Sequence, residues 1–186
     1  MEFANDTNER ALVVAAQGGD RSAFDRLLQQ HTPRLLALAN RMLGNVPDSQ
    51  DAVQNALASA WLALSRFDPA LRLGPWLATI TINKCRDAIR SRRFTQMLSS
   101  GGDDGTFLIA DDTPDQEHQL HGRQLLAQVE REIVLLPLKL REPFVLVTFD
   151  NRSQAEAAAI LDISEKAVET RIYRARQQLR EKFADF

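Results

Sequence analysis

The sequence of 186 residues has few of the residues that mark particular protein classes. Its one cysteine, Cys85, excludes an internal disulfide and gives no sign of an oxidising compartment. Glycine occurs eight times and proline seven times, too rarely for a collagen-like or wholly disordered chain. Aromatic residues make up only 6% of the chain, and Leu, Ala and Arg dominate, which favours α-helix.

Long apolar runs are also missing. The longest, such as Ile133–Leu136 and Phe144–Val147, fall far short of the roughly 20 residues that a membrane-spanning helix needs. The N-terminal segment Met1–Asn8 is polar and acidic, unlike a secretory signal. We therefore expect a soluble cytoplasmic protein with no membrane contact of its own.

Sequence patterns of catalysis and cofactor binding are lacking as well. There is no glycine-rich phosphate-binding loop, catalytic triad or catalytic carboxylate pair. His118 and His121 are three residues apart beside acidic residues, but they lie in a polar segment where solvent-exposed histidines are the commoner case. We expect no enzyme activity, no metal site and no cofactor.

The net charge of −2 conceals an uneven distribution of charged residues. Residues 1–94 carry twelve Lys and Arg against nine Asp and Glu, residues 95–118 none against six, and residues 119–186 eleven against ten. The basic residues gather in two clusters, Lys84–Arg93 and Lys166–Lys182. Two basic clusters separated by an acidic connector suit a polyanion contacted at two places, although two solvated helix faces give the same pattern.

Hydrophobic spacing predicts an all-α protein with two small helical domains, residues 1–94 and 119–186. Between them, in residues 95–118, the helical periodicity fails, and Ser99–Gly105 and Ala110–Asp115 are acidic and rich in turn formers. Such a segment cannot bury enough apolar surface to offset the entropy lost on ordering. We predict a flexible acidic linker there.

Within residues 1–94 the apolar spacing, together with the glycine, proline and capping residues between apolar stretches, predicts four helices. The first ends near Gly18, and the second begins at Ser22 and ends at Gly44, with Pro33 expected to kink or break it. The third starts after Pro47, with Asp48 or Ser49 as its cap.

The fourth helix is predicted to begin at Pro75, because proline suits a first turn. Thr79–Ile82 alternates β-branched residues, so a strand competes locally, but the flanks favour helix. Trp76 is either a base-stacking residue or part of the core, and its helical spacing favours the core.

Residues 153–182 carry the most informative pattern. Ser153 is placed to cap a short helix to Leu161, and after a turn Ser164 is placed to cap a longer one. The spacing of Val168, Ile172, Ala175 and Leu179 predicts one buried face. The other face presents polar and basic side chains that suit a major groove, as in a helix-turn-helix, although an ordinary helical hairpin has the same spacing.

These residues, with others along the chain, resemble the extracytoplasmic-function (ECF, group IV) bacterial sigma factors. Asp48–Gln54 resembles the family's region 2.2, and Trp76-Leu77, Ile80–Asn83 and Arg90–Arg93 resemble regions 2.3 and 2.4. The matches to region 4 are Leu136-Pro137, Arg141, Ser153, Glu156, Ala158-Ala159 and Val168–Arg176. The resemblance covers about residues 8–183 and includes the acidic linker.

The resemblance implies a protein that binds core RNA polymerase and helps to recognise and melt promoter DNA. It assigns contact with the polymerase clamp to Asp51, Gln54 and Asn55. For the −10 element the resemblance implies Asn83, whose side-chain amide offers both a donor and an acceptor. It also implies the loop residues Asp68, Pro69, Ala70, Leu71, Arg72 and Leu73, and the basic residues Lys84, Arg86 and Arg90.

For the −35 element the resemblance implies Lys166, Glu169, Thr170, Arg171, Tyr173, Arg174 and Arg176. Glu169 lies where relatives often carry a basic residue. Its carboxylate either accepts a hydrogen bond from a cytosine amine or is repelled by a phosphate. The linker either threads towards the polymerase cleft or is a mere tether. The resemblance also implies an anti-sigma partner, and we expect a monomer when free.

Two other functions remain open at this point. A free-standing helix-turn-helix regulator would explain residues 153–182 but leave Asp48–Gln54 and Asn83 without a role. A helical adaptor would use the basic faces to hold a protein partner. Tight, specific binding of the isolated protein to DNA would favour the regulator. A function that does not depend on nucleic acid would favour the adaptor.

Overall fold

The computed structural model describes residues 2–99 and 117–183, with side chains described for residues 8–98 and 126–183. Its elements are α1 (Glu2–Gln17), α2 (Arg21–Leu43), α3 (Val46–Ala63), the 3₁₀ turn η1 (Leu64–Arg66), α4 (Leu73–Ser99), α5 (Glu117–Leu135), α6 (Leu138–Thr148), α7 (Gln154–Leu161) and α8 (Glu165–Lys182). These ranges contain no strand, so the all-α prediction is confirmed for them.

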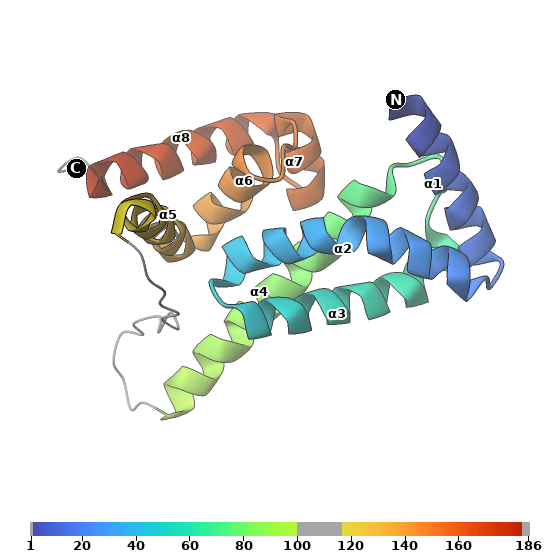
Figure 1. The fold of residues 1–186 in the computed structure, drawn as a ribbon, viewed down its shortest axis with the longest axis horizontal. Helices are drawn as coiled ribbons and strands as arrows, with labels where there is room; N and C mark the ends of the chain where they lie inside the picture. The colour runs from blue at the N-terminus through green and yellow to red at the C-terminus, as the bar shows by residue number, and fades with distance from the viewer. Residues whose placement is uncertain (1, 100–116, 184–186) are drawn as a thin grey trace.

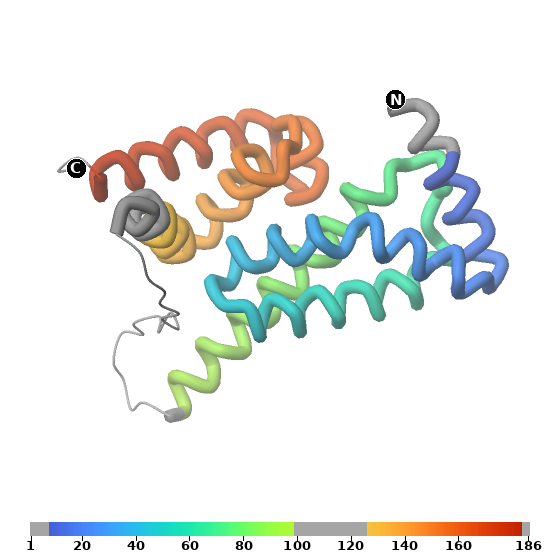
Figure 2. Tube along the Cα trace, in the orientation of Figure 1, coloured from blue at the N-terminus to red at the C-terminus, as the bar shows by residue number. Residues whose placement is uncertain are grey.

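The first four helices form one packed unit. Helices α2 and α3 lie side by side, α4 crosses both, and α1 covers the N-terminal half of α2 (Figure 2). Leu27, Met42 and Ile82 are fully buried where these helices meet. The β-branched stretch around Thr81 is helical, as predicted, and the Thr81 hydroxyl donates to the carbonyl of Leu77.

The helix starts differ from the predicted ones. Helix α2 begins at Arg21, one residue before the predicted start at Ser22, and Asp20 caps it by accepting hydrogen bonds from the amides of Ser22 and Ala23. Asn45 caps α3, its Oδ1 accepting from the amide of Asp48 at 2.9 Å. The prediction of Asp48 or Ser49 as the cap is wrong, because proline fits inside the first turn and the helix therefore begins before Pro47.

Of the kink or break predicted at Pro33, the break is wrong, since α2 runs unbroken through it. Proline removes one amide donor and so frees the carbonyl of Gln29. Both Pro33 and Gln29 are exposed, so water can satisfy that carbonyl. The packing of both halves of α2 against its neighbours then keeps the helix continuous.

The last four helices form the second packed unit, with Ile133, Leu146 and Val168 fully buried. Residues 95–99 and 117–118 of the predicted linker belong to α4 and α5, so helix extends further on both sides than predicted. The rest of the predicted linker lies outside the described residues, as do the side chains of His118 and His121. The helices of the described ranges include none that is long and apolar enough to cross a membrane.

The two units lie against each other. Helices α5, α6 and α7 pack on α2 and α4, while α3 lies on the far side of the first unit (Figure 1). Gly44, which ends α2 with φ 75°, faces Val134 of α5 so closely that a Cβ there would lie 2.8 Å from its Cγ1. The contact between the two units therefore depends on a glycine at this position.

Cys85 provides a test of this packing. It is fully buried in α4, and burial, with the nearby charge of Glu142, raises the pKa of its thiol to about 12. We expect iodoacetamide at about pH 8.5 to alkylate it roughly a thousandfold more slowly than an unfolded thiol, because little thiolate is present. The same chain unfolded in guanidinium should react at the ordinary rate, and rapid native alkylation would contradict the burial.

Candidate nucleic-acid interface

The outer face of α3 is polar and open. Asp51, Gln54 and Asn55 are all exposed on it, whereas Val53 and Ala56 are buried on the opposite face. Spacings of three and four residues place the polar side chains side by side on the helix. The structure therefore brings the predicted polymerase-contact residues together on one accessible surface.

The loop before α4 is exposed over most of the predicted −10 segment. The carboxylate of Asp68 accepts from the amide of Ala70 at 2.9 Å, which holds the turn, and Leu71 is 63% exposed. Leu73 is the exception among the predicted contact residues. It is 1% exposed because it begins α4 and packs into the core, so its side chain is not available to DNA.

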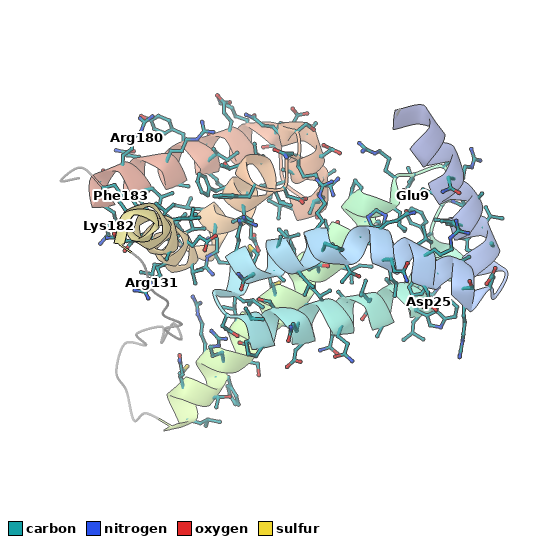
Figure 3. The ribbon with its side chains drawn as sticks, viewed as in Figure 1. Glu9, Asp25, Arg131, Arg180, Lys182 and Phe183 are labelled. Carbon is teal, nitrogen blue, oxygen red and sulfur yellow. The ribbon has the colours of Figure 1, made fainter. Side chains whose placement is uncertain are left out.

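Glu9 of α1 contacts the end of this loop (Figure 3). One carboxylate oxygen accepts from the amide of Leu73 at 3.3 Å, and the other pairs with Nε2 of His31 at 2.9 Å. The hydrogen bond to His31 is the main cause of a lowered pKa for Glu9. Neither Glu9 nor His31 was predicted, because they come from two other helices and form no local pattern in the sequence.

The predicted −10 residues of α4 differ in accessibility. Asn83 is exposed, and its Oδ1 accepts from Nη1 of Arg86 at 2.9 Å. Arg90 is exposed beside Asp87, and Lys84 is half-buried. Arg86 is also half-buried, because it faces the second unit.

The predicted core role of Trp76 agrees with its packing. Its ring is half-buried at the N-terminal end of α4, and its centroid lies 4.8 Å from that of Phe67. Aromatic pairs at this separation stabilise one another beyond their buried area. This indole therefore helps to fix the loop against α4.

Helices α7 and α8 form the predicted helix-turn-helix. Ser153 and Glu156 make a reciprocal capping box at the start of α7, and Asp162 adopts a left-handed conformation in the turn. The Ser164 hydroxyl caps α8 by accepting from the amide of Ala167. The caps at Ser153 and Ser164 are confirmed.

The inner face of α8 buries Val168, Ile172 and Ala175, and Leu179 packs half-buried beside them. The predicted −35 residues lie on the rest of its surface: Lys166, Glu169, Thr170, Tyr173, Arg174 and Arg176 are exposed, and Arg171 is half-buried. Nζ of Lys166 lies 2.8 Å from the Glu169 carboxylate, so a lysine of the same helix partly offsets the negative charge of Glu169. Arg180 and Lys182 lie at the other end of α8 (Figure 3).

Charged side chains join the two units. Glu142 of α6 accepts from Arg86 of α4 through both carboxylate oxygens, Nε at 2.5 Å and Nη2 at 3.0 Å. Asp150 pairs with Arg34 of α2 and with Arg152. Neither of the two pairs between the units was predicted, because Arg86 and Glu142, like Arg34 and Asp150, lie far apart in the sequence.

Arg141 makes a further contact across this interface. Nη1 donates to the carbonyl of Met42 at the end of α2, and Nη2 donates to the carbonyl of Leu136 after α5. Only 4% of the residue is exposed, and burial lowers the pKa of its guanidinium to about 10. A cation at the C-terminal ends of two helices is favourable, so Arg141 links the helices of both units.

Known proteins match this chain along both units. The model of sigma-70 region 2 matches residues 27–95, and that of sigma-70 region 4 matches residues 126–179. RNA polymerase sigma factor CnrH of Cupriavidus metallidurans is 40% identical over 177 residues, which is 92% of each chain. The ECF RNA polymerase sigma factor SigW of Bacillus subtilis is 30% identical over 178 residues, 93% of this chain and 95% of SigW.

The chain belongs to the ECF sigma factors. This sigma factor is therefore a transcription-initiation factor and not an enzyme, and its partners are core RNA polymerase and promoter DNA. The matches cover both units, so a free-standing regulator or adaptor does not account for the chain. A solved structure of CnrH in complex with the cytosolic domain of CnrY resembles it with a TM-score of 0.72, at 32% identity over 96% of this chain and 98% of that one.

Proposed function

We propose that this sigma factor binds the polymerase clamp with the α3 face and reads promoters with two separate surfaces. The loop Asp68–Arg72 and the outward face of α4 serve the −10 element, and α8 serves the −35 element. The observation that carries most weight is the exposed row Lys166, Thr170 and Arg174 on a helix whose opposite side is fully packed. A helix so presented can enter a major groove and meet base edges.

Glu169 belongs to the same reading surface in this proposal. Its pairing with Lys166 lowers the repulsion that a free carboxylate would meet near phosphates. A carboxylate in the groove accepts from a cytosine amine, so a cytosine in the −35 element is the base it favours. Glu169→Gln should relax that preference in a selection from randomised −35 sequences.

Regulation by an anti-sigma factor is part of the proposal. The similar CnrH structure contains the cytosolic domain of CnrY, and its likeness extends over both units of this chain. A protein partner that holds both units would keep α3 and α8 from reaching polymerase and promoter together. We further propose that the protein acts in the cytoplasm as a monomer when free of its partners.

In vitro transcription with core polymerase and a library of promoter fragments tests the function. Start sites that depend on this protein and share −35 and −10 sequences are the expected result. Binding of core without any initiation would point to a non-cognate polymerase or a missing activator. Failure to bind core polymerase at all would overturn the proposal.

Arg174 allows a test of the −35 surface by itself. We expect Arg174→Ala to weaken −35-dependent recruitment roughly tenfold, since a good arginine–base contact contributes about 1–3 kcal/mol. Competition between promoter fragments with intact and scrambled −35 elements measures the effect. Lys182→Ala, at the far end of the same helix, is the matched control, and unchanged promoter selection by Arg174→Ala would remove Arg174 from the reading surface.

A further inference from the structure

Helix α1 binds both ends of the segment that carries the proposed −10 loop. Nε2 of Gln17 donates to the carbonyls of Leu64, at 2.9 Å, and Phe67, at 2.7 Å. Glu9 lies about two turns earlier on the same helix. One of its carboxylate oxygens accepts from the amide of Leu73 at 3.3 Å. The segment between α3 and α4 therefore runs along α1 (Figure 1).

The backbone groups that α1 binds belong to helix ends. Leu64 is the C-cap of α3, Phe67 is the C-cap of η1, and Leu73 is the first residue of α4. Helix ends leave backbone carbonyls and amides short of partners within the helix. A donor at a C-terminal end and a carboxylate at an N-terminal end also match the helix dipole. Side chains of α1 thus cap the two helix ends between which the loop lies.

The side chains that make these contacts are held in place themselves. The second carboxylate oxygen of Glu9 pairs with Nε2 of His31 at 2.9 Å, and the two side chains are only 18% and 16% exposed. Gln17 is half-buried, and Val13 and Ala16 of the same helix are buried in the core. Helix α1 therefore offers the loop a fixed support.

The stretch between the two supported ends faces outward. Phe67 and Leu73 are 6% and 1% exposed, whereas Ala70, Leu71 and Arg72 between them are exposed. A binding site needs its contacting groups held within about 0.5 Å of the productive geometry. An exposed loop meets this requirement only if its two ends are fixed, and here α1 fixes both.

We propose that α1 takes part in promoter selection: Gln17 and Glu9 are positioning residues that hold the −10 loop in its base-reading shape without contacting DNA themselves. The region 2 model matches residues 27–95, so both residues lie before the matched range. The inference rests on the proposed −10 role of the loop. It adds that the accuracy of −10 recognition depends on two side chains of another helix.

Substitutions at the two contacts test the proposal in the full chain. Gln17→Glu keeps the side-chain shape but replaces the donating amide with a carboxylate that repels both carbonyls. Glu9→Ala removes the acceptor for the Leu73 amide, whereas Glu9→Gln keeps an oxygen that accepts from it and is the conservative rescue. Gln30→Glu, at an exposed glutamine of α2, is the matched control. Circular dichroism checks that each variant is folded, and the two Glu9 variants decide the outcome if Gln17→Glu is not.

The main readout is discrimination at the −10 element. It is the ratio of initiation rates on a promoter selected by the native protein and on single-base variants of its −10 element. We expect Gln17→Glu and Glu9→Ala to lower this ratio about tenfold, the size of one lost base contact, and Glu9→Gln and the control to stay close to the native value. Affinity for core polymerase and discrimination at the −35 element should not change. Amide hydrogen exchange of residues 64–73 should be faster in Gln17→Glu and Glu9→Ala.

Native −10 discrimination in both Gln17→Glu and Glu9→Ala would overturn the proposal. Equal losses at the −10 and −35 elements would overturn it as well, because α1 would then support the fold as a whole and not the loop. Hydrogen exchange at the native rate in both variants would show that the two contacts do not hold the loop.

Substitution within the loop separates these outcomes from a failure of the proposed function. If Leu71→Ser/Arg72→Ser leaves −10 discrimination unchanged, the loop does not read the −10 element, and the proposed function of the loop is wrong together with the role of α1. If the loop variant lowers −10 discrimination while Gln17→Glu and Glu9→Ala do not, the proposed function stands and only the role of α1 is wrong.

Discussion

Asn83→Ala is expected to slow open-complex formation at least about tenfold while leaving affinity for core polymerase nearly unchanged, because one lost bidentate base contact costs about 1–3 kcal/mol. Asn83 is exposed on α4, and its Oδ1 accepts a hydrogen bond from Nη1 of Arg86. Its amide offers both a donor and an acceptor to an unstacked base. Alanine removes both without disturbing the buried side of the helix.

Permanganate footprinting of melted promoter and native-gel binding of core polymerase measure the two effects separately. Asn40→Ala, at another exposed asparagine, on α2, is the matched control. Equal losses of melting and of polymerase binding would show that Asn83 supports the fold or the polymerase contact and does not read the −10 element.

Gly44→Ala is expected to lower the free energy of unfolding by about 2–3 kcal/mol, because two penalties combine at this residue. The φ of 75° is strained for any residue with a Cβ, and that Cβ would lie 2.8 Å from Cγ1 and 3.0 Å from Cγ2 of Val134. Val134 is buried on α5, so relief of the clash must separate the two units or shift α5. Urea unfolding measures the loss.

A double-mutant cycle separates the two penalties. Val134→Ala removes both γ-methyl groups but leaves the backbone strain, so the Gly44→Ala/Val134→Ala variant should be less destabilised than the sum of the single variants by at least about 0.5 kcal/mol. Strict additivity would mean that the strained backbone alone accounts for the cost and that the close approach of the units is unimportant.

Local sequence was sufficient for much of the candidate site. The helix-turn-helix followed from the capping serines at 153 and 164 and from the spacing of Val168, Ile172 and Ala175, because caps and periodicity act within one or two helical turns. The polar residues Asp51, Gln54 and Asn55 on α3 were singled out by the family resemblance. The roles of individual residues at these surfaces stay predictions.

Residues whose environment comes from other helices were misjudged or missed. The sequence places Leu73 in a loop, yet Leu73 begins α4 and is buried in the core, and Glu9 of α1 accepts a hydrogen bond from its amide. The sequence predicts that Pro33 kinks or breaks the helix, yet the packing of α2 on its neighbours keeps it continuous. In both cases tertiary contacts outweigh the local preference.

The sequence by itself determined the helical class, the ends of α7 and α8, the two basic clusters and the family resemblance, because these depend on residue types and on contacts a few residues apart. Only the tertiary structure decided that Glu142 meets Arg86, that Asp150 meets Arg34 and that Arg141 reaches the carbonyl of Met42. These partners are separated by 56, 116 and 99 positions. No local pattern encodes such pairs, because they form only when separately folded helices come together.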